Sequence, residues 1–174
     1  MSINNPTKKP LPMLAEDKDA RGLLKALKQG ANPNQRNSTG KTALHYAAVC
    51  WKQRFISKLI EFGCNPRLKD IDGFLPLHNA VATQNFSVIN VLIQNGGNIN
   101  TRVKNGLAPI HMSIITRDLK ILRMLVNHGA DLNIKDGSDG TTPQELAHIF
   151  GFAEGISFLN RRATRQKKIN EDRG

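Results

Sequence analysis

Apolar side chains recur in four stretches of this chain with the spacing of an amphipathic helix. Within each stretch they stand three or four residues apart, which predicts a helix with one buried stripe. The four sets are Leu23, Leu24 and Leu27; Ile56, Leu59 and Ile60; Val88, Val91 and Leu92; and Ile121, Leu122, Leu125 and Val126. A glycine follows each set, where a helix commonly ends with a residue of positive φ. These glycines, Gly30, Gly63, Gly96 and Gly129, lie 33 residues apart, so the helices belong to a repeat.

A second motif precedes the last three of these helices at the same spacing. Its full form is Gly73-Phe74-Leu75-Pro76-Leu77-His78, and related hexapeptides begin at Gly40 and Gly106. A weaker version begins at Gly140, one residue later than the 33-residue spacing requires. Threonine or proline ahead of the apolar residue favours a helix start at this point. Each unit therefore reads as a short helix, a turn, a second helix and an extended loop.

The two motifs together resemble the ankyrin repeat, whose 33-residue pattern carries Gly-x-Thr-Pro-Leu-His-x-Ala-Ala and ends in Gly-Ala-Asp-x-Asn. The resemblance covers roughly residues 7–165 and implies an all-α fold, an ankyrin-repeat solenoid of stacked helix-turn-helix units joined by β-hairpin-like loops. Terminal units of such an array have one face without a neighbour and are expected to depart from the pattern. We predict a disordered N-terminus at 1–6, a degenerate N-terminal capping repeat at 7–39, central repeats at 40–72, 73–105 and 106–139, a C-terminal capping repeat at 140–163, and a basic tail at 164–174.

The motif histidines, His45, His78 and His111, are the first candidates for chemistry. Because they occupy the same place in successive repeats about 10 Å apart, they cannot converge on one metal ion. We therefore expect each to form hydrogen bonds with a neighbouring loop. The repeat glycines Gly40, Gly73, Gly106 and Gly140 are likewise expected to be structural. Nothing in the sequence combines a nucleophile with a base or cradles a phosphate, so we expect no enzyme activity, no catalytic residues and no cofactor.

Composition says more about the compartment in which the protein works than about its function. The chain has 174 residues, 39% of them hydrophobic, and a formal net charge of +11. The two cysteines, Cys50 and Cys64, form no metal-binding pair, and we expect both to be buried in a protein of a reducing compartment. The sequence shows no secretory signal and no stretch of about 18 apolar residues. We expect a cytoplasmic protein without integral membrane association, and leave nuclear entry or delivery into a host cell open.

Four cations just before the predicted hairpin tips repeat at 33-residue spacing. These hairpin cations are Arg36, Lys69, Arg102 and Lys135. Two interpretations stay open. The positions tolerate any solvated Lys or Arg, or they form a basic row for an acidic partner surface.

The resemblance also implies where a partner binds, because ankyrin proteins use the hairpin tips and the concave face of the short helices. In that setting Ile71, Phe74 and Leu107 are expected to be exposed apolar anchors, and Trp51 another. Packing of Trp51 against the next turn is the alternative. Trp51, Gln84, Arg117 and Gly151 stand where a repeat usually has a left-handed glycine, and a larger residue there costs about 1 kcal/mol.

The primary hypothesis is a non-enzymatic adaptor or inhibitor that binds another protein, one with an acidic surface. A weaker resemblance, based on the lengthened unit at Gly106–Gly140, is to the inhibitor-of-NF-κB subfamily, which includes the case of a pathogen mimic that suppresses host immune signalling. The missing paired-serine degron and acidic tail argue against it. A third hypothesis, a basic nucleic-acid-associated protein, is suggested by the net charge and by the basic segment 161–168. That segment lacks interleaved aromatic residues, which weakens the nucleic-acid reading.

Overall fold

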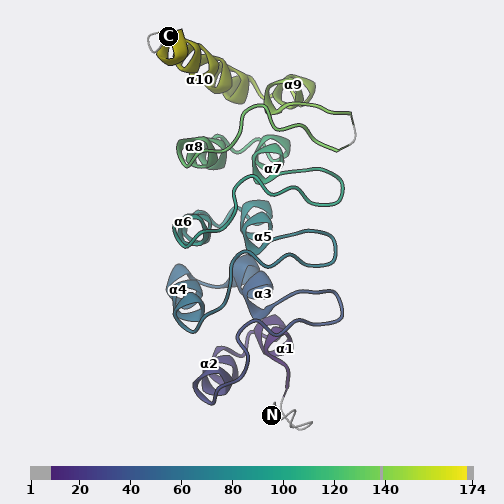
Figure 1. Ribbon diagram of the computed structural model, residues 1–174, viewed down its shortest axis with the longest axis vertical. Coiled ribbons are helices and arrows are strands. Elements are labelled where there is room, and N and C mark those ends of the chain that lie inside the picture. The colour runs from purple at the N-terminus through teal and green to yellow at the C-terminus, as the bar shows by residue number, and fades with distance from the viewer. Residues whose placement is uncertain (1–8, 138, 172–174) are drawn as a thin grey trace. The chain divides into compact units, whose positions relative to one another are not determined.

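The computed structural model describes residues 9–137 and 139–171, and within these residues every regular element is a helix (Figure 1). The described part of the chain forms ten helices. They are α1 (Leu11–Glu16), α2 (Ala20–Lys28), α3 (Ala43–Cys50), α4 (Gln53–Glu61), α5 (Pro76–Ala82), α6 (Phe86–Gln94), α7 (Pro109–Ile115), α8 (Leu119–Asn127), α9 (Pro143–Ile149) and α10 (Ala153–Glu171). The all-α fold class predicted from the sequence is therefore confirmed.

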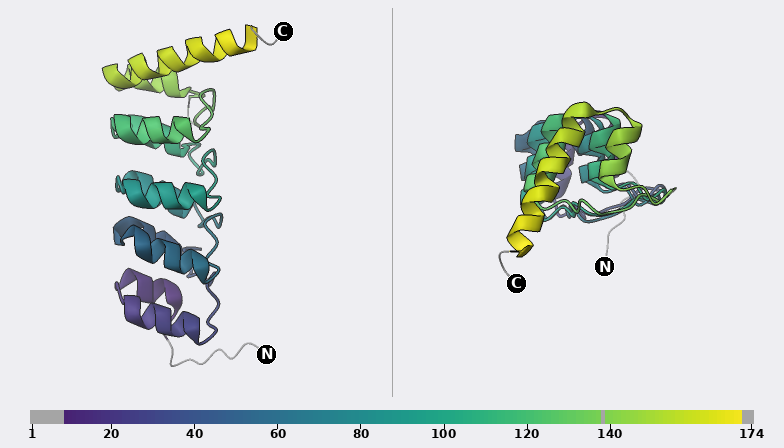
Figure 2. Two further views of the ribbon diagram at one scale, coloured as in Figure 1. Left: turned by 90° about the vertical axis from the view of Figure 1, so that its left-hand side faces the viewer. Right: turned by 90° about the horizontal axis from the view of Figure 1, so that it is seen from above.

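The helices come in consecutive pairs, a short helix followed by a second helix, with an extended hairpin between one pair and the next. The chain divides into two compact units, Met1–Asn98 and Ile99–Gly174. In the first unit the short helices α1, α3 and α5 pack in sequence, and α4 packs on α6. In the second, α7 packs on α9 and α8 on α10. Figure 2 shows that within each unit the hairpins project to one side of the helices.

The core of each unit consists of the side chains that the periodic pattern singles out. Leu44 and Leu77 of the short helices are fully buried, as are Ile56 and Leu92 of the second helices. In the second unit Ile110, Ile121 and Leu125 are buried in the same way. Burying one such side chain stabilises the fold by roughly 1.5–3 kcal/mol relative to leaving it exposed, so the stripes supply most of the driving force for helix pairing.

The motif histidines join each short helix to the backbone around it. The Thr42 N–H donates to His45 Nδ1 at 3.0 Å, and His45 Nε2 lies 3.0 Å from the Phe74 carbonyl oxygen. His111 repeats this with the Ala108 N–H at 3.0 Å and the Ile134 carbonyl at 3.1 Å. Because Nδ1 accepts a hydrogen bond from a backbone N–H, it carries no proton, and because a carbonyl oxygen can only accept, Nε2 carries the hydrogen; the ring is therefore neutral.

Glycines with positive φ close the hairpins, and one of them is also required by a close backbone approach. Gly40, Gly73, Gly106 and Gly140 have φ of 75°, 87°, 81° and 68°. A Cβ added to Gly106 would lie 1.8 Å from the Gly137 nitrogen and 2.1 Å from the Gly137 Cα. A larger residue cannot fit at Gly106 unless the backbone of the next hairpin moves.

The turns between paired helices follow one rule with one exception. Lys18, Gln84 and Arg117 adopt left-handed φ values of 59°, 53° and 51°, and Gly151 adopts 58°. Trp51 does not, because its backbone is extended with φ −96° and ψ 156°. The turn at Trp51 is therefore not left-handed and follows a different path.

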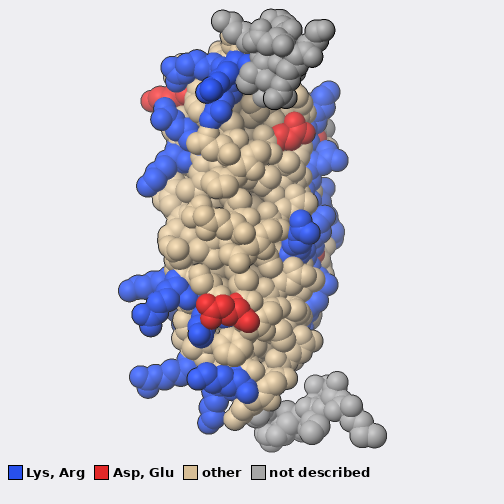
Figure 3. Space-filling view, turned by 60° about the vertical axis from the view of Figure 1, so that its left-hand side comes forward, with Lys and Arg blue, Asp and Glu red and all other residues tan. Residues whose placement is uncertain are grey.

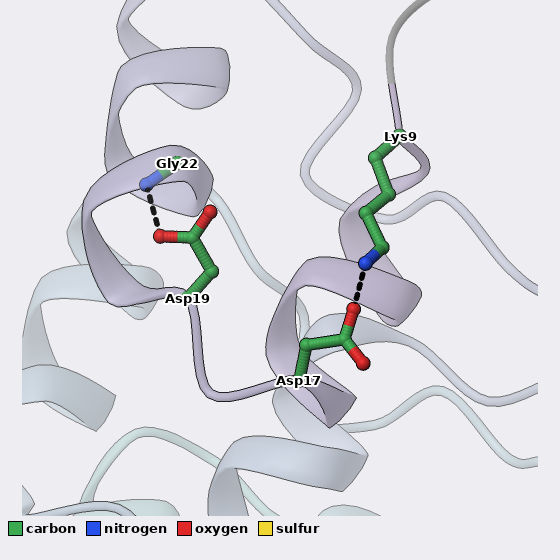
Figure 4. Close-up of polar contacts among 4 residues, drawn as sticks. All are labelled: Lys9, Asp17, Asp19 and Gly22. Carbon is green, nitrogen blue, oxygen red and sulfur yellow. Dashed lines mark hydrogen bonds and ion pairs between the residues drawn. The ribbon is translucent and has the colours of Figure 1, made fainter.

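A capping residue follows three of the four left-handed positions, whereas Phe152 after Gly151 and Lys52 after Trp51 have no side-chain acceptor. Asp19, Asn85 and Asp118 accept hydrogen bonds from the N–H groups of Gly22, Val88 and Ile121, which caps α2, α6 and α8. Figure 4 shows the Asp19 cap beside the ion pair of Lys9 and Asp17. Lys52, which has no acceptor in its side chain, holds the equivalent place before α4.

The C-terminal region differs from the predicted boundary. α10 runs from Ala153 to Glu171, so residues 164–171 of the expected basic tail continue a helix. The predicted disordered segment 1–6 lies outside the described residues, and the repeat boundaries stay predictions. In the part of the chain that is described, none of the helices combines the length and apolar character needed to cross a membrane.

Candidate partner-binding surfaces

The hairpin cations of the first unit are Arg36 and Lys69, and the arginine bonds to the backbone of both hairpins. Arg36 Nε donates to the Gly40 carbonyl at 3.0 Å, and the same guanidinium donates to the carbonyl of Lys69. Both residues are exposed. Arg36 therefore fixes one hairpin against the next while its charge stays at the surface.

The second unit repeats this arrangement with Arg102 and Lys135. Arg102 Nη1 donates to the Lys135 carbonyl at 3.1 Å, and both residues are exposed. In each pair the arginine bonds to the backbone of the lysine, and the lysine contributes its carbonyl group to that contact. Replacing all four cations would therefore disturb hairpin packing, whereas the two lysines can be changed with less structural cost.

The apolar residues predicted at the hairpin tips differ in exposure. Ile71 is 54% exposed, as expected of a contact residue. Phe74 and Leu107 are half-buried, so they are less exposed than the predicted anchors. The Phe74 ring packs edge-on against His78, with 5.7 Å between ring centroids, and its carbonyl accepts the bond from His45. Phe74 is thus tied to the scaffold, which corrects the prediction that it projects freely.

Trp51 and Cys50, at the end of α3, each contradict an expectation. Trp51 is 8% exposed, and its ring lies edge-to-face with Phe55 at 4.2 Å between centroids. It is a buried residue and not an exposed anchor, because the extended turn directs the indole against α4. Cys50 is exposed, whereas Cys64 is buried as expected. Burial raises the pKa of the Cys64 thiol to about 12, and the thiol donates weakly to the Pro33 carbonyl.

A hollow of about 1130 Å³ lies beside this exceptional turn, entirely within the first unit. Its wall comes from the turn itself, from one side of α4 along its whole length, from one residue of α2, and from two residues at the start of α6. The lining residues are Leu24, Cys50, Trp51, Lys52, Gln53, Arg54, Phe55, Ser57, Lys58, Glu61, Asn85 and Ser87.

Three of the short helices carry an exposed apolar residue at or next to their last position, which the sequence analysis missed. Val49 is 44% exposed, Ile115 37% and Ile149 70%. These residues fall at corresponding positions of α3, α7 and α9, and the signal that reveals them is the repeat itself, 33 residues per unit with one added residue between Ile115 and Ile149. Apolar residues at equivalent exposed positions of several repeats are typical of a contact surface.

Carboxylate and amide side chains that shape the hairpins were also missed. Asp70 accepts the N–H groups of Asp72 and Phe74 at 3.0 and 2.9 Å, and Asn37 holds the preceding hairpin in the same way. In the lengthened hairpin the Asp136 N–H bonds to the Thr141 carbonyl, one residue further along than in the others. Ser138 of that hairpin lies outside the described residues. These contacts fix the tips from which a partner would be recognised.

Electrostatics at the histidines supports a structural role. Burial lowers the pKa of His45 against the opposing effects of its bond to the Phe74 carbonyl and of nearby Asp70. Burial lowers the pKa of His111 in the same way, opposed by the Ile134 carbonyl and Asp136. In the described ranges, no three His, Cys, Asp or Glu side chains are grouped in a way that would hold a metal ion.

Comparison with known proteins adds one match. The family model described as ankyrin repeats (3 copies) matches residues 13–103 and again residues 82–170. Comparison with curated proteins gives no match.

Proposed function

Because the chain belongs to the ankyrin-repeat family, we propose that it is a non-enzymatic module that binds another protein through its hairpin tips and short helices. Ankyrin repeats generally mediate protein–protein interaction. The observation that carries the proposal is the exposed apolar residues near the ends of short helices, Val49 in the first unit and Ile115 and Ile149 in the second. Such side chains lose contact with water when a partner covers them, which favours association.

The partner surface that would complement the charge of this protein is acidic. The chain carries a formal net charge of +11, and Lys69 and Lys135 are exposed on the hairpins. Opposite charge on the partner would speed association and favour the correct partner over others. In this proposal the protein acts as an adaptor or inhibitor by occupying that surface, with Ile71 as an apolar contact on the same hairpin as Lys69.

The test begins with affinity capture from the native cell and continues with the purified captured protein. Lys69→Glu combined with Lys135→Glu is expected to weaken its binding about tenfold and to reduce the dependence of binding on salt. Ile149→Ser is expected to weaken binding without changing the helical circular dichroism, because the side chain is 70% exposed.

A matched control carries the same change in charge elsewhere. Arg21→Glu with Arg161→Glu alters two exposed cations on α2 and α10, away from the hairpins. If the control weakens binding as much as the hairpin variant, the interaction depends on net charge and the hairpin surface is not the site. If only nucleic acid is captured and the interaction is lost steeply at about 150 mM salt, the protein-binding proposal is wrong.

A further inference from the structure

The hollow beside the α3–α4 turn is a feature that partner binding through the hairpins does not use. Trp51 and Phe55 form its apolar part, and a second hollow of about 540 Å³ that reaches Lys18 shares these two residues. The hairpin at Gly40 lies at the opposite end of α3, about 12 Å away along an eight-residue helix. A ligand in this hollow would thus leave the hairpins accessible.

This hollow lies where the chain breaks its own repeat. At three equivalent turns the chain has Lys18-Asp19, Gln84-Asn85 and Arg117-Asp118, a left-handed residue followed by a capping acceptor. At the fourth, Gly151 is left-handed and Phe152 offers no acceptor. Trp51-Lys52 replaces that pair with an extended backbone and no acceptor. The next repeat supports the altered turn, because Asn85 Nδ2 donates to the Trp51 carbonyl at 3.3 Å. The two substitutions add an aromatic ring and a cation at this turn in place of a cap.

The rim of the two hollows is strongly basic. Lys18, Lys52, Arg54 and Lys58 line them, and the acidic residue among the lining positions, Glu61, is paired with Lys58 at 3.1 Å. Figure 3 shows Lys and Arg side chains projecting at the level of the N-terminal helices, with one acidic patch beside them. Three cations around Trp51 and Phe55, namely Lys18, Lys52 and Arg54, are left to meet a ligand of opposite charge.

We propose that this hollow is a second docking site, which takes an acidic peptide segment with one large apolar side chain. The apolar side chain would contact Phe55 and the edge of Trp51, while flanking carboxylates would face Lys18, Lys52 and Arg54. A carboxylate beside Lys52 would also lie at the first turn of α4, the place where Asp19, Asn85 and Asp118 supply an acceptor in three of the other pairs.

A protein segment fits this site better than single-stranded nucleic acid. Nucleic-acid sites of this kind stack bases on open aromatic faces. Trp51 is 8% exposed and packs edge-to-face with Phe55, so its ring offers no open face to a base. An aliphatic or aromatic side chain of a peptide can bind by contacting only the edge of the Trp51 ring and the half-buried Phe55.

The test uses two reporters that the chain already contains. Trp51 is the only tryptophan, so its fluorescence reports on the site directly. Cys50 is exposed and lines the hollow, whereas Cys64 is buried, so a thiol reagent in the folded protein follows Cys50. The probe is a synthetic peptide with one leucine flanked by glutamates. Binding is expected to shift the Trp51 emission and slow modification of Cys50, and a peptide with lysines in place of the glutamates is expected to do neither.

Two charge variants separate this site from the hairpins. Lys52→Glu with Arg54→Glu is expected to weaken peptide binding about tenfold, whereas Lys69→Glu with Lys135→Glu is expected to leave it unchanged. Equal loss in both variants, or no response of either reporter, would overturn the proposal. Equal protection of Cys50 by a single-stranded oligonucleotide at the same salt concentration would also overturn it. None of these results bears on the hairpin variants and their captured partner, so the two proposals fail independently.

Discussion

The hairpin end and the helix-turn end of each repeat differ in how much freedom they leave the sequence. At the hairpin end, glycines of positive φ recur because they close the turns. The histidine bonds and the Arg36 and Arg102 contacts recur because each satisfies a backbone carbonyl in the next hairpin. At the helix-turn end, Gln84-Asn85 follows the rule and Trp51-Lys52 breaks it, yet both turns connect paired helices. Residues that recur in every repeat hold the scaffold together in this chain. Where the fold tolerates a different residue, as at the helix-turn end, the surface is free to acquire a binding site.

The largest effect on the free energy of unfolding is expected from adding a methyl group at the hairpin end. Gly106→Ala should lower the free energy of unfolding by about 3 kcal/mol, from the left-handed backbone and from overlap with the Gly137 backbone. Gly129→Ala is the matched control, because Gly129 has φ +90° and nothing within 4 Å of an added Cβ. It should cost about 1 kcal/mol. Urea unfolding measures both, and equal losses would show that the close approach at Gly106 is not a constraint.

Lowering the pH should weaken the hairpin end more than the helix-turn end. The pKa values of His45 and His111 are lowered in the folded protein, so the unfolded chain binds more protons as pH falls below about 6.5. Their contribution is therefore intact above that pH and is lost as pH falls toward the folded-state pKa. Each histidine should remove up to about 1 kcal/mol of stability between about pH 7.5 and 5.5.

Urea unfolding at the two pH values measures this effect, and the exposed histidines supply the control. His128→Gln with His148→Gln changes two exposed side chains on or beside α8 and α9. The pH dependence should persist in that variant. Its disappearance would assign the effect to the surface histidines instead of the buried His45 and His111.

The smallest effect is expected from restoring the missing cap. Lys52→Asp should stabilise the first unit by about 1 kcal/mol, since the carboxylate can accept N–H groups at the start of α4. Asn85→Ala, which removes the equivalent cap of α6, should destabilise the same unit by about 1 kcal/mol. Thermal unfolding compares the two. A loss of stability in Lys52→Asp would mean that the extended turn cannot present a capping side chain.

The periodic features of the fold are accessible from the sequence, because they depend on positions that every repeat shares. The apolar stripes, the glycines and the histidine positions are of this kind. The exposure of single residues is not, since it depends on the path of one turn. Cys50 is exposed and Trp51 buried because the α3–α4 turn is extended, and the sequence shows the substitution there without its direction. The contacts of Arg36 and Arg102 were missed because a surface arginine gives no sign of which carbonyl it reaches.

The histidine and arginine contacts at the hairpin end also bear on how such an array changes over time. His45, Arg36 and Arg102 each reach a main-chain carbonyl of the following repeat and not one of its side chains. Every residue type supplies that carbonyl, so the following hairpin can accept almost any sequence at its tip without losing the joint. Substitutions at the tips are thereby uncoupled from the assembly of the array, and new specificities can arise there one residue at a time.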